Sequence, residues 1–196
     1  MRFPNRKLLG VGMRQLLMWW LVLGFAVQAG ADELRVGSKA PVFEAKDPTG
    51  KTVKLADFRG RQHVLLVVWS KECPVSAGEM EPLQKLHQEY QRAKEKPLVV
   101  LGMNIDETKG ADVARWMKER KLTFPTVCDD KRAVLNLYGA TVTPTFFLID
   151  KDGVIQAKYA SGGETVRRAL AEDVAELVRD GKVTPREQPV LPTVFG

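Results

Sequence analysis

One short segment combines residue types that can do chemistry at a suggestive spacing: Ser70-Lys71-Glu72-Cys73-Pro74. It follows a continuous apolar, β-branched run over residues 63–69, which predicts a buried strand. Pro74 suits the first position of a helix, because its missing N–H would have no partner there. Cys73 is then the predicted N-cap, where free N–H groups and the helix dipole stabilise a thiolate. Thiolate is the reactive form, so we predict a reactive Cys73, with an inert buried cysteine as the alternative.

The second of the two cysteines, Cys128, ends a predicted strand over residues 124–128. The carboxyl ends of parallel strands gather at one edge of a sheet, which would put it on the side of Cys73. A disulfide needs Cα atoms within about 7 Å. Cys128 is therefore a candidate resolving cysteine, and a small buried hydrophobic residue is the alternative. With His63 and His87 as the only histidines, we predict no metal site.

Two acidic residues follow the next predicted strand, which covers residues 98–105. Asp106 and Glu107 come directly after its carboxyl end, at the edge of the sheet where the active residues are expected. We expect them in a solvated loop, and a place beside the reactive cysteine is the alternative.

The N-terminus has the order of a secretory signal peptide. Four basic residues precede a twelve-residue apolar run, Leu16 to Val27, and Ala29-Gly30-Ala31 offers a cleavage site. We predict a signal peptide over 1–31, and an uncleaved membrane anchor is the alternative. Removing its four basic residues from the total of 30 leaves 26 against 24 acidic residues, a net charge of +2 instead of +6. This balance gives no support for nucleic-acid binding.

Alternating strand and helix patterns over residues 32–182 predict one α/β domain. We expect a mixed, mostly parallel central sheet with helices on both faces and an N-terminal β-hairpin around residues 47–51. Residues 183–196 carry three prolines and are predicted to be an extended tail.

The order of these segments resembles the thioredoxin superfamily in its redoxin branch, which includes exported thiol–disulfide oxidoreductases and peroxiredoxins. The resemblance implies a thioredoxin-like fold, a cis peptide bond at Pro144 and an edge position for the strand that carries Cys128. The segments that carry it, besides residues 69–74, are 37–43 (GSKAPVF), 55–61 (LADFRGR) and 138–150 (YGATVTPTFFLID).

The chain departs from both branches of this group. Thioredoxins carry Trp-Cys-x-x-Cys, and in that alignment Ser70 replaces the first, nucleophilic cysteine while Cys73 is the second. Peroxiredoxins carry Thr-x-x-Cys, which Ser70-x-x-Cys73 resembles. However, Leu66 stands where they have a proline, and Pro144 stands roughly where they place an activating arginine.

The resemblance implies an exported, periplasmic or secreted thiol-based oxidoreductase with peroxiredoxin-like antioxidant activity through Cys73. The alternatives are thiol–disulfide exchange with a partner protein and a non-catalytic binding protein of the same fold. Expected partners are protein thiols or disulfides, or peroxide, with an external thiol as electron donor. No cofactor, nucleic acid or stable membrane span after cleavage is expected. The predicted site comprises catalytic Cys73 and Ser70, the candidate resolving Cys128, and site-shaping Trp69, Pro74, Thr143 and Pro144.

Overall fold

The computed structural model describes residues 34–95 and 97–185. The predicted signal peptide lies outside the described residues, as does the predicted tail beyond residue 185. None of the helices in the described part of the chain is both long and apolar enough to cross a membrane.

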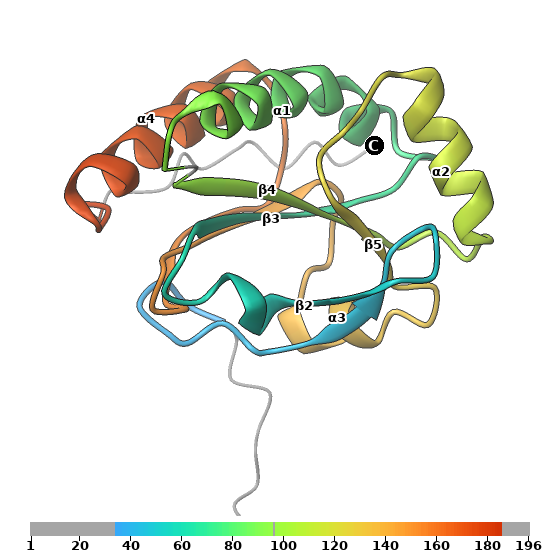
Figure 1. The fold of residues 1–196 in the computed structure, drawn as a ribbon, viewed down its shortest axis with the longest axis horizontal. Coiled ribbons are helices and arrows are strands. Elements are labelled where there is room, and N and C mark those ends of the chain that lie inside the picture. Colours follow the sequence, from blue (N-terminus) through green and yellow to red (C-terminus); the bar gives the residue numbers. More distant parts are fainter. Residues whose placement is uncertain (1–33, 96, 186–196) are drawn as a thin grey trace, which may run out of the picture. The chain divides into compact units, whose positions relative to one another are not determined.

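A seven-stranded sheet in the order β2-β1-β5-β4-β3-β6-β7 forms the centre of the domain (Figure 1). Its hairpin β1–β2 is the one predicted near the N-terminus. The elements follow the chain as β1 (Glu44–Lys46), β2 (Thr52–Lys54), the 3-10 helix η1 (Leu55–Phe58), β3 (His63–Trp69), α1 (Pro74–Arg92), β4 (Leu98–Asn104), α2 (Gly110–Glu119), β5 (Thr126–Cys128), α3 (Ala133–Tyr138), β6 (Thr145–Ile149), β7 (Ile155–Tyr159) and α4 (Glu164–Asp180).

Strands β3 and β4 are buried along their whole length because both faces of the sheet are covered. Successive side chains of a strand point to opposite faces. Leu65 and Val67 thus join an apolar cluster with residues of α1, α2 and α4. Leu66 and Val68 join a second cluster with residues of α3, η1 and the N-terminal segment. Figure 1 shows the same division, with α1, α2 and α4 on one side of the sheet and α3 on the other. The predicted α/β fold with helices on both faces is confirmed.

The expected parallel majority is wrong, because among the strands of the described residues only β3–β4 and β4–β5 pair in parallel. Strand β6 pairs antiparallel with β3, and its first residue, Thr145, lies opposite Val68 near the carboxyl end of β3. The six-residue helix α3 explains why β6 runs antiparallel to β3. At 1.5 Å per residue it is about 9 Å long, too short to carry the chain back to the other end of the sheet. The chain therefore leaves the sheet after β5 and returns as β6 at the same end of the sheet, which makes β6 antiparallel to β3.

The strand that carries Cys128 is not at the edge that the resemblance implied. Strand β5 lies between β4 and β1, and Lys46 of β1 pairs directly with Cys128. The N-terminal hairpin extends the sheet beyond β5, so this cysteine lies inside the sheet.

Candidate active site

The sulfur of Cys73 lies at the N-terminus of α1, as predicted. Cys73 is the N-cap in an extended conformation, with φ −88° and ψ 114°, and Pro74 begins the helix. The backbone N–H of Ser76 donates to Sγ at 3.5 Å, and the thiol donates to the carbonyl oxygen of Thr143 at 3.2 Å. The side chain is partly exposed. Cys73 is therefore only partly buried, and its sulfur is hydrogen-bonded to two separate segments.

The surroundings of Cys73 favour its ionised form. Burial raises the pKa of the thiol, but hydrogen bonds with the side chain of Thr143, with the side chain and backbone of Ser76 and with the backbone of Val75 outweigh burial and hold the pKa below its ordinary value. Hydrogen-bond donors at a helix N-terminus stabilise a thiolate more than a neutral thiol. The arrangement therefore supplies a nucleophile.

Ser76 is a site residue that the sequence analysis missed. It lies in the first turn of α1, three residues after Cys73, and its side chain is fully buried. Cys73-Pro74-Val75-Ser76 thus has the spacing of a Cys-x-x-Cys turn, with a hydroxyl in place of the second sulfur. The signal present in the sequence is a serine three residues after a cysteine that begins a helix.

The hydroxyl of Ser70 is directed to a buried carboxylate. Its Oγ donates to Oδ1 of Asp106 at 2.5 Å and accepts the N–H of Glu72 at 3.1 Å. The other carboxylate oxygen accepts the N–H of Lys71 at 2.9 Å and Nδ2 of Asn104 at 2.8 Å. Asp106 is buried, so the expected solvated loop is wrong for this residue. Its contacts Ser70 and Lys71 lie 36 and 35 positions away in sequence, which no local pattern reveals.

The predicted site-shaping residues divide into two groups. The peptide bond Thr143-Pro144 is cis, as the resemblance implied, and Thr143 touches the sulfur of Cys73. Pro74 is exposed beside it at the start of α1. Trp69, in contrast, is fully buried and packs on Trp116 with ring centroids 5.1 Å apart. It belongs to the core behind the site.

Cys128 is not close to Cys73. It pairs with Asn104 of β4, which pairs in turn with Trp69 of β3. Two strand spacings, about 10 Å, thus separate Cys128 from the end of β3. The sulfur of Cys73 contacts Thr143, which precedes β6 on the opposite side of β3. Both thiols are free, and the strand positions put them beyond the reach of a disulfide in this conformation.

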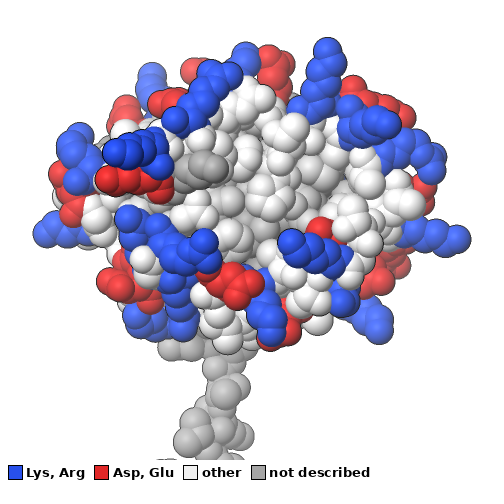
Figure 2. Space-filling model, in the orientation of Figure 1, with Lys and Arg blue, Asp and Glu red and all other residues white. Residues whose placement is uncertain are grey.

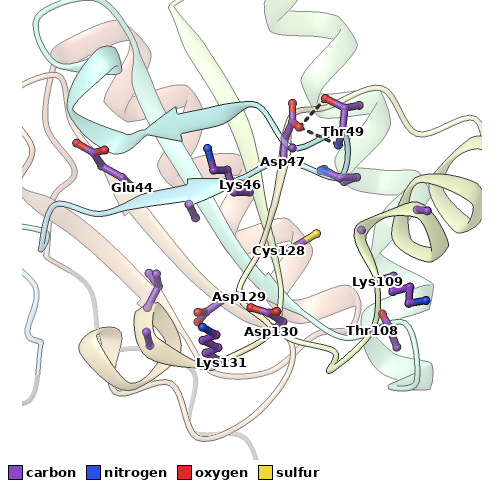
Figure 3. Close-up of a pocket in the computed structure, with 17 residues that line it drawn as sticks. Glu44, Lys46, Asp47, Thr49, Thr108, Lys109, Cys128, Asp129, Asp130 and Lys131 are labelled. Atoms are coloured by element: carbon purple, nitrogen blue, oxygen red, sulfur yellow. Dashed lines mark hydrogen bonds between the residues drawn. The ribbon is translucent and has the colours of Figure 1, made fainter.

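Cys128 lines a cavity of its own, of about 640 Å³, between the β1–β2 turn, the start of α2 and the end of β5. Figure 3 shows it among charged residues of both signs, including Lys46, Asp47 and Asp130. Burial raises the pKa of this thiol, and the carboxylates of Asp130, Asp47 and Asp106 raise it further. The pKa of the thiol is thus raised at Cys128 and lowered at Cys73.

The profile of the AhpC/TSA family matches residues 36–158, a stretch that includes Cys73, Asp106, Cys128 and Thr143. The chain belongs to the AhpC/TSA family. The predicted membership of the redoxin branch of the thioredoxin superfamily is confirmed.

Curated relatives and solved structures agree with this AhpC/TSA assignment. The thiol-disulfide oxidoreductase ResA of Bacillus subtilis is 31% identical over 163 residues, covering 81% of this chain and 84% of that protein. ResA of Bacillus thuringiensis subsp. konkukian is 32% identical over 154 residues, covering 76% and 85%. A crystal structure from Chlorobium tepidum, proposed to be the thiol:disulfide interchange protein DsbE, matches with a TM-score of 0.68 and 27% identity over 74% of this chain and 99% of that one. The chain is a thiol-dependent oxidoreductase.

Proposed function

We propose that the chain carries out thiol–disulfide exchange with Cys73 as its single reacting thiol. The observation that carries the proposal is the partly exposed Cys73 at the N-cap of α1, where hydrogen bonds lower the pKa of its thiol. Relatives named thiol-disulfide oxidoreductase support the reaction class.

In this proposal Cys73 stands in the place of the first cysteine of Cys-x-x-Cys, and Ser76 replaces the second. The nucleophilic thiol of such a motif gains from the helix N-terminus, and Cys73 is the N-cap of α1. Ser70 lies before the helix, and its hydroxyl is bound to Asp106. This assignment replaces the alignment in which Ser70 stood for the nucleophile and Cys73 for the resolving cysteine.

The exchange then proceeds in two steps. The thiolate of Cys73 attacks one sulfur of a partner disulfide, forming a mixed disulfide and releasing the other partner sulfur as a thiolate. Ser76 has no sulfur to attack this bond, and Cys128 lies out of reach. In the second step two external thiolates must reduce the mixed disulfide. One attacks the sulfur of Cys73 and releases the second partner sulfur as a thiolate, and the other then attacks the sulfur bound to Cys73, forming an external disulfide and releasing Cys73 as a thiolate.

The surface around the sulfur suits a polypeptide partner. Val75 and Val142 are exposed to 48% and 46%, and they flank the two segments that meet at Cys73. We assign Thr143 and Pro144 to shaping this surface, with the backbone of Thr143 available to the partner chain, and Pro74 to its rim.

Reduction of peroxide is a second candidate, favoured by the same stabilised thiolate. Attack by Cys73 on a peroxide O–O bond would give a sulfenic acid and an alcohol or water, and an external thiol would then reduce the sulfenic acid. Ser70, expected to position the peroxide, gives its hydroxyl hydrogen to Asp106 instead. We therefore rank this reaction second.

We further propose that the protein works in the periplasm or outside the cell, after removal of residues 1–31. The proposal rests on the signal-peptide pattern alone. Basic and acidic side chains lie side by side over the face in Figure 2, consistent with the near-balanced charge that remains.

Intact mass of the full chain tests the reaction. After treatment with oxidised glutathione, we expect one glutathione adduct, absent in Cys73→Ser and retained in the matched control Cys128→Ser. If hydrogen peroxide adds oxygen to Cys73 and oxidised glutathione forms no adduct, peroxide reduction replaces thiol–disulfide exchange as the proposed reaction. If neither oxidised glutathione nor hydrogen peroxide modifies Cys73 faster than a thiol in the unfolded chain, the remaining hypothesis is a non-catalytic binding protein.

A further inference from the structure

The four residues that lead from β3 to α1 rest on a buried carboxylate contributed by the end of the neighbouring strand. From this arrangement we infer that Asp106 is a positioning residue for Cys73, acting through the hydroxyl of Ser70. The inference rests on the proposed role of Cys73 as nucleophile and adds a residue that never touches the sulfur.

Asp106 is itself held rigidly from β4. Oδ2 of Asp106 accepts a hydrogen bond from Nδ2 of Asn104 at 2.8 Å. The backbone N–H of Asp106 donates to Oδ1 of Asn104 at 3.3 Å. Asn104 is fully buried, and the next residue, Ile105, donates its N–H to the carbonyl of Trp69 at 3.1 Å. The carboxylate is thus fixed against the end of β3, where the loop to Cys73 begins.

The loop binds this carboxylate at its first two residues. Ser70 donates its hydroxyl hydrogen to Oδ1 at 2.5 Å, and Lys71 donates its N–H to Oδ2 at 2.9 Å. Together with Asn104, three donors surround one carboxylate. A carboxylate with three donors holds its partners in a narrow range of positions.

Ser70 connects the carboxylate of Asp106 to Cys73 through hydrogen bonds. Its oxygen Oγ accepts the N–H of Glu72 at 3.1 Å while it donates to Asp106. Its carbonyl oxygen accepts the N–H of Cys73 at 3.3 Å. The backbone N–H groups of Lys71, Glu72 and Cys73 are therefore all held by Asp106 or by Ser70.

The direction in which neutralising Asp106 changes the pKa of the Cys73 thiol distinguishes a positioning role from a purely electrostatic one. The other charged groups of the loop, Lys71 and Glu72, form an ion pair with each other. If Asp106 acted on Cys73 only as a nearby negative charge, its neutralisation would lower the pKa of the thiol. If Asp106 positions the N-cap, its neutralisation loosens the bonds from the helix N-terminus and raises that pKa.

The test is the pH dependence of alkylation of Cys73 by iodoacetamide, followed by mass in the full chain. Asp106→Asn is expected to move the midpoint to higher pH and to slow alkylation at neutral pH by about threefold, since only the thiolate reacts. Glu107→Gln is the matched control, because this adjacent carboxylate is 71% exposed and pairs with Arg132. It should leave the profile unchanged.

A double-mutant cycle tests the route through Ser70. Ser70→Ala should raise the midpoint as Asp106→Asn does, and the two changes combined should do little more than either alone. Ser70→Thr, which keeps the hydroxyl, should restore the profile, and this Ala–Thr pair decides the matter if Asp106→Asn does not fold. An unchanged or lowered midpoint in Asp106→Asn, or fully additive effects, would overturn the inference. Alkylation needs no partner disulfide, so failure of the exchange reaction would be seen separately.

Discussion

At the residue scale, two cysteines of one chain have opposite properties because of their immediate neighbours. Cys73 meets hydrogen-bond donors at the start of a helix, whereas Cys128 lies among carboxylates inside the sheet. The sequence was sufficient to predict Cys73 as the N-cap, because Cys73 follows a predicted strand closely and Pro74 comes directly after it. It was insufficient for Asp106, whose contacts with Ser70 and Lys71 join separate strands.

The two thiols should therefore titrate on opposite sides of the ordinary cysteine value. Hydrogen bonds lower the pKa of Cys73, so its alkylation should persist as pH falls below that value. Burial and nearby carboxylates raise the pKa of Cys128, so its alkylation should begin only at higher pH. The measurement is the alkylation rate against pH in Cys128→Ser and Cys73→Ser, each with one thiol left. Overlapping profiles would contradict this account of the site.

At the element scale, the sequence predicted the strands and helices well because their apolar periodicity is strong. The continuous run 63–69 is β3 itself. Pairing direction was harder to predict, since it depends on how far a connection carries the chain. The short α3 returns β6 antiparallel, and the hairpin β1–β2 covers β5. Neither feature is visible in local periodicity.

Close packing between strands at Gly102 gives a prediction about β4. A Cβ atom here would lie 2.5 Å from Oγ1 of Thr126 and 2.9 Å from Nε1 of Trp69. Gly102→Ala should lower the free energy of unfolding by about 1–3 kcal/mol, because the core has no room for the methyl group. Gly78 in α1 has open space around its Cβ position. Gly78→Ala should raise the free energy of unfolding by about 0.5–1 kcal/mol, because alanine favours a helix.

Urea denaturation of the two glycine variants beside the unchanged chain provides the measurement. Equal stability of Gly102→Ala and the unchanged chain would show that β4, β5 and Trp69 are less tightly packed than described.

At the scale of the whole molecule, both histidines are buried in the domain. Burial lowers the pKa of His63, with help from the charge of Lys151, and burial alone lowers that of His87. The unfolded chain takes up these protons near pH 6.5, and the folded chain only at lower pH. Above about pH 6.5 both histidines are neutral in the folded and the unfolded chain, so they do not reduce the free energy of unfolding. As pH falls below about 6.5 toward the folded pKa values, the unfolded chain binds more protons than the folded chain, and the free energy of unfolding decreases.

Replacement of both histidines by glutamine should flatten this dependence. Between about pH 7 and pH 5 the unchanged chain should lose stability, by at most about 1.4 kcal/mol per histidine and pH unit, and the double variant should lose less. Urea unfolding at the two pH values measures the difference. Parallel losses in the two proteins would assign the dependence to other groups.

The most direct test of the account is whether a cysteine placed at position 76 completes the motif that begins at Cys73. Ser76→Cys and Ser70→Cys are prepared in the Cys128→Ser chain and weighed by intact mass after mild oxidation. We predict that Ser76→Cys loses two hydrogens, reversed by reductant, and that Ser70→Cys does not. A disulfide in Ser70→Cys and none in Ser76→Cys would contradict the assignment of Cys73 as the first cysteine of the motif.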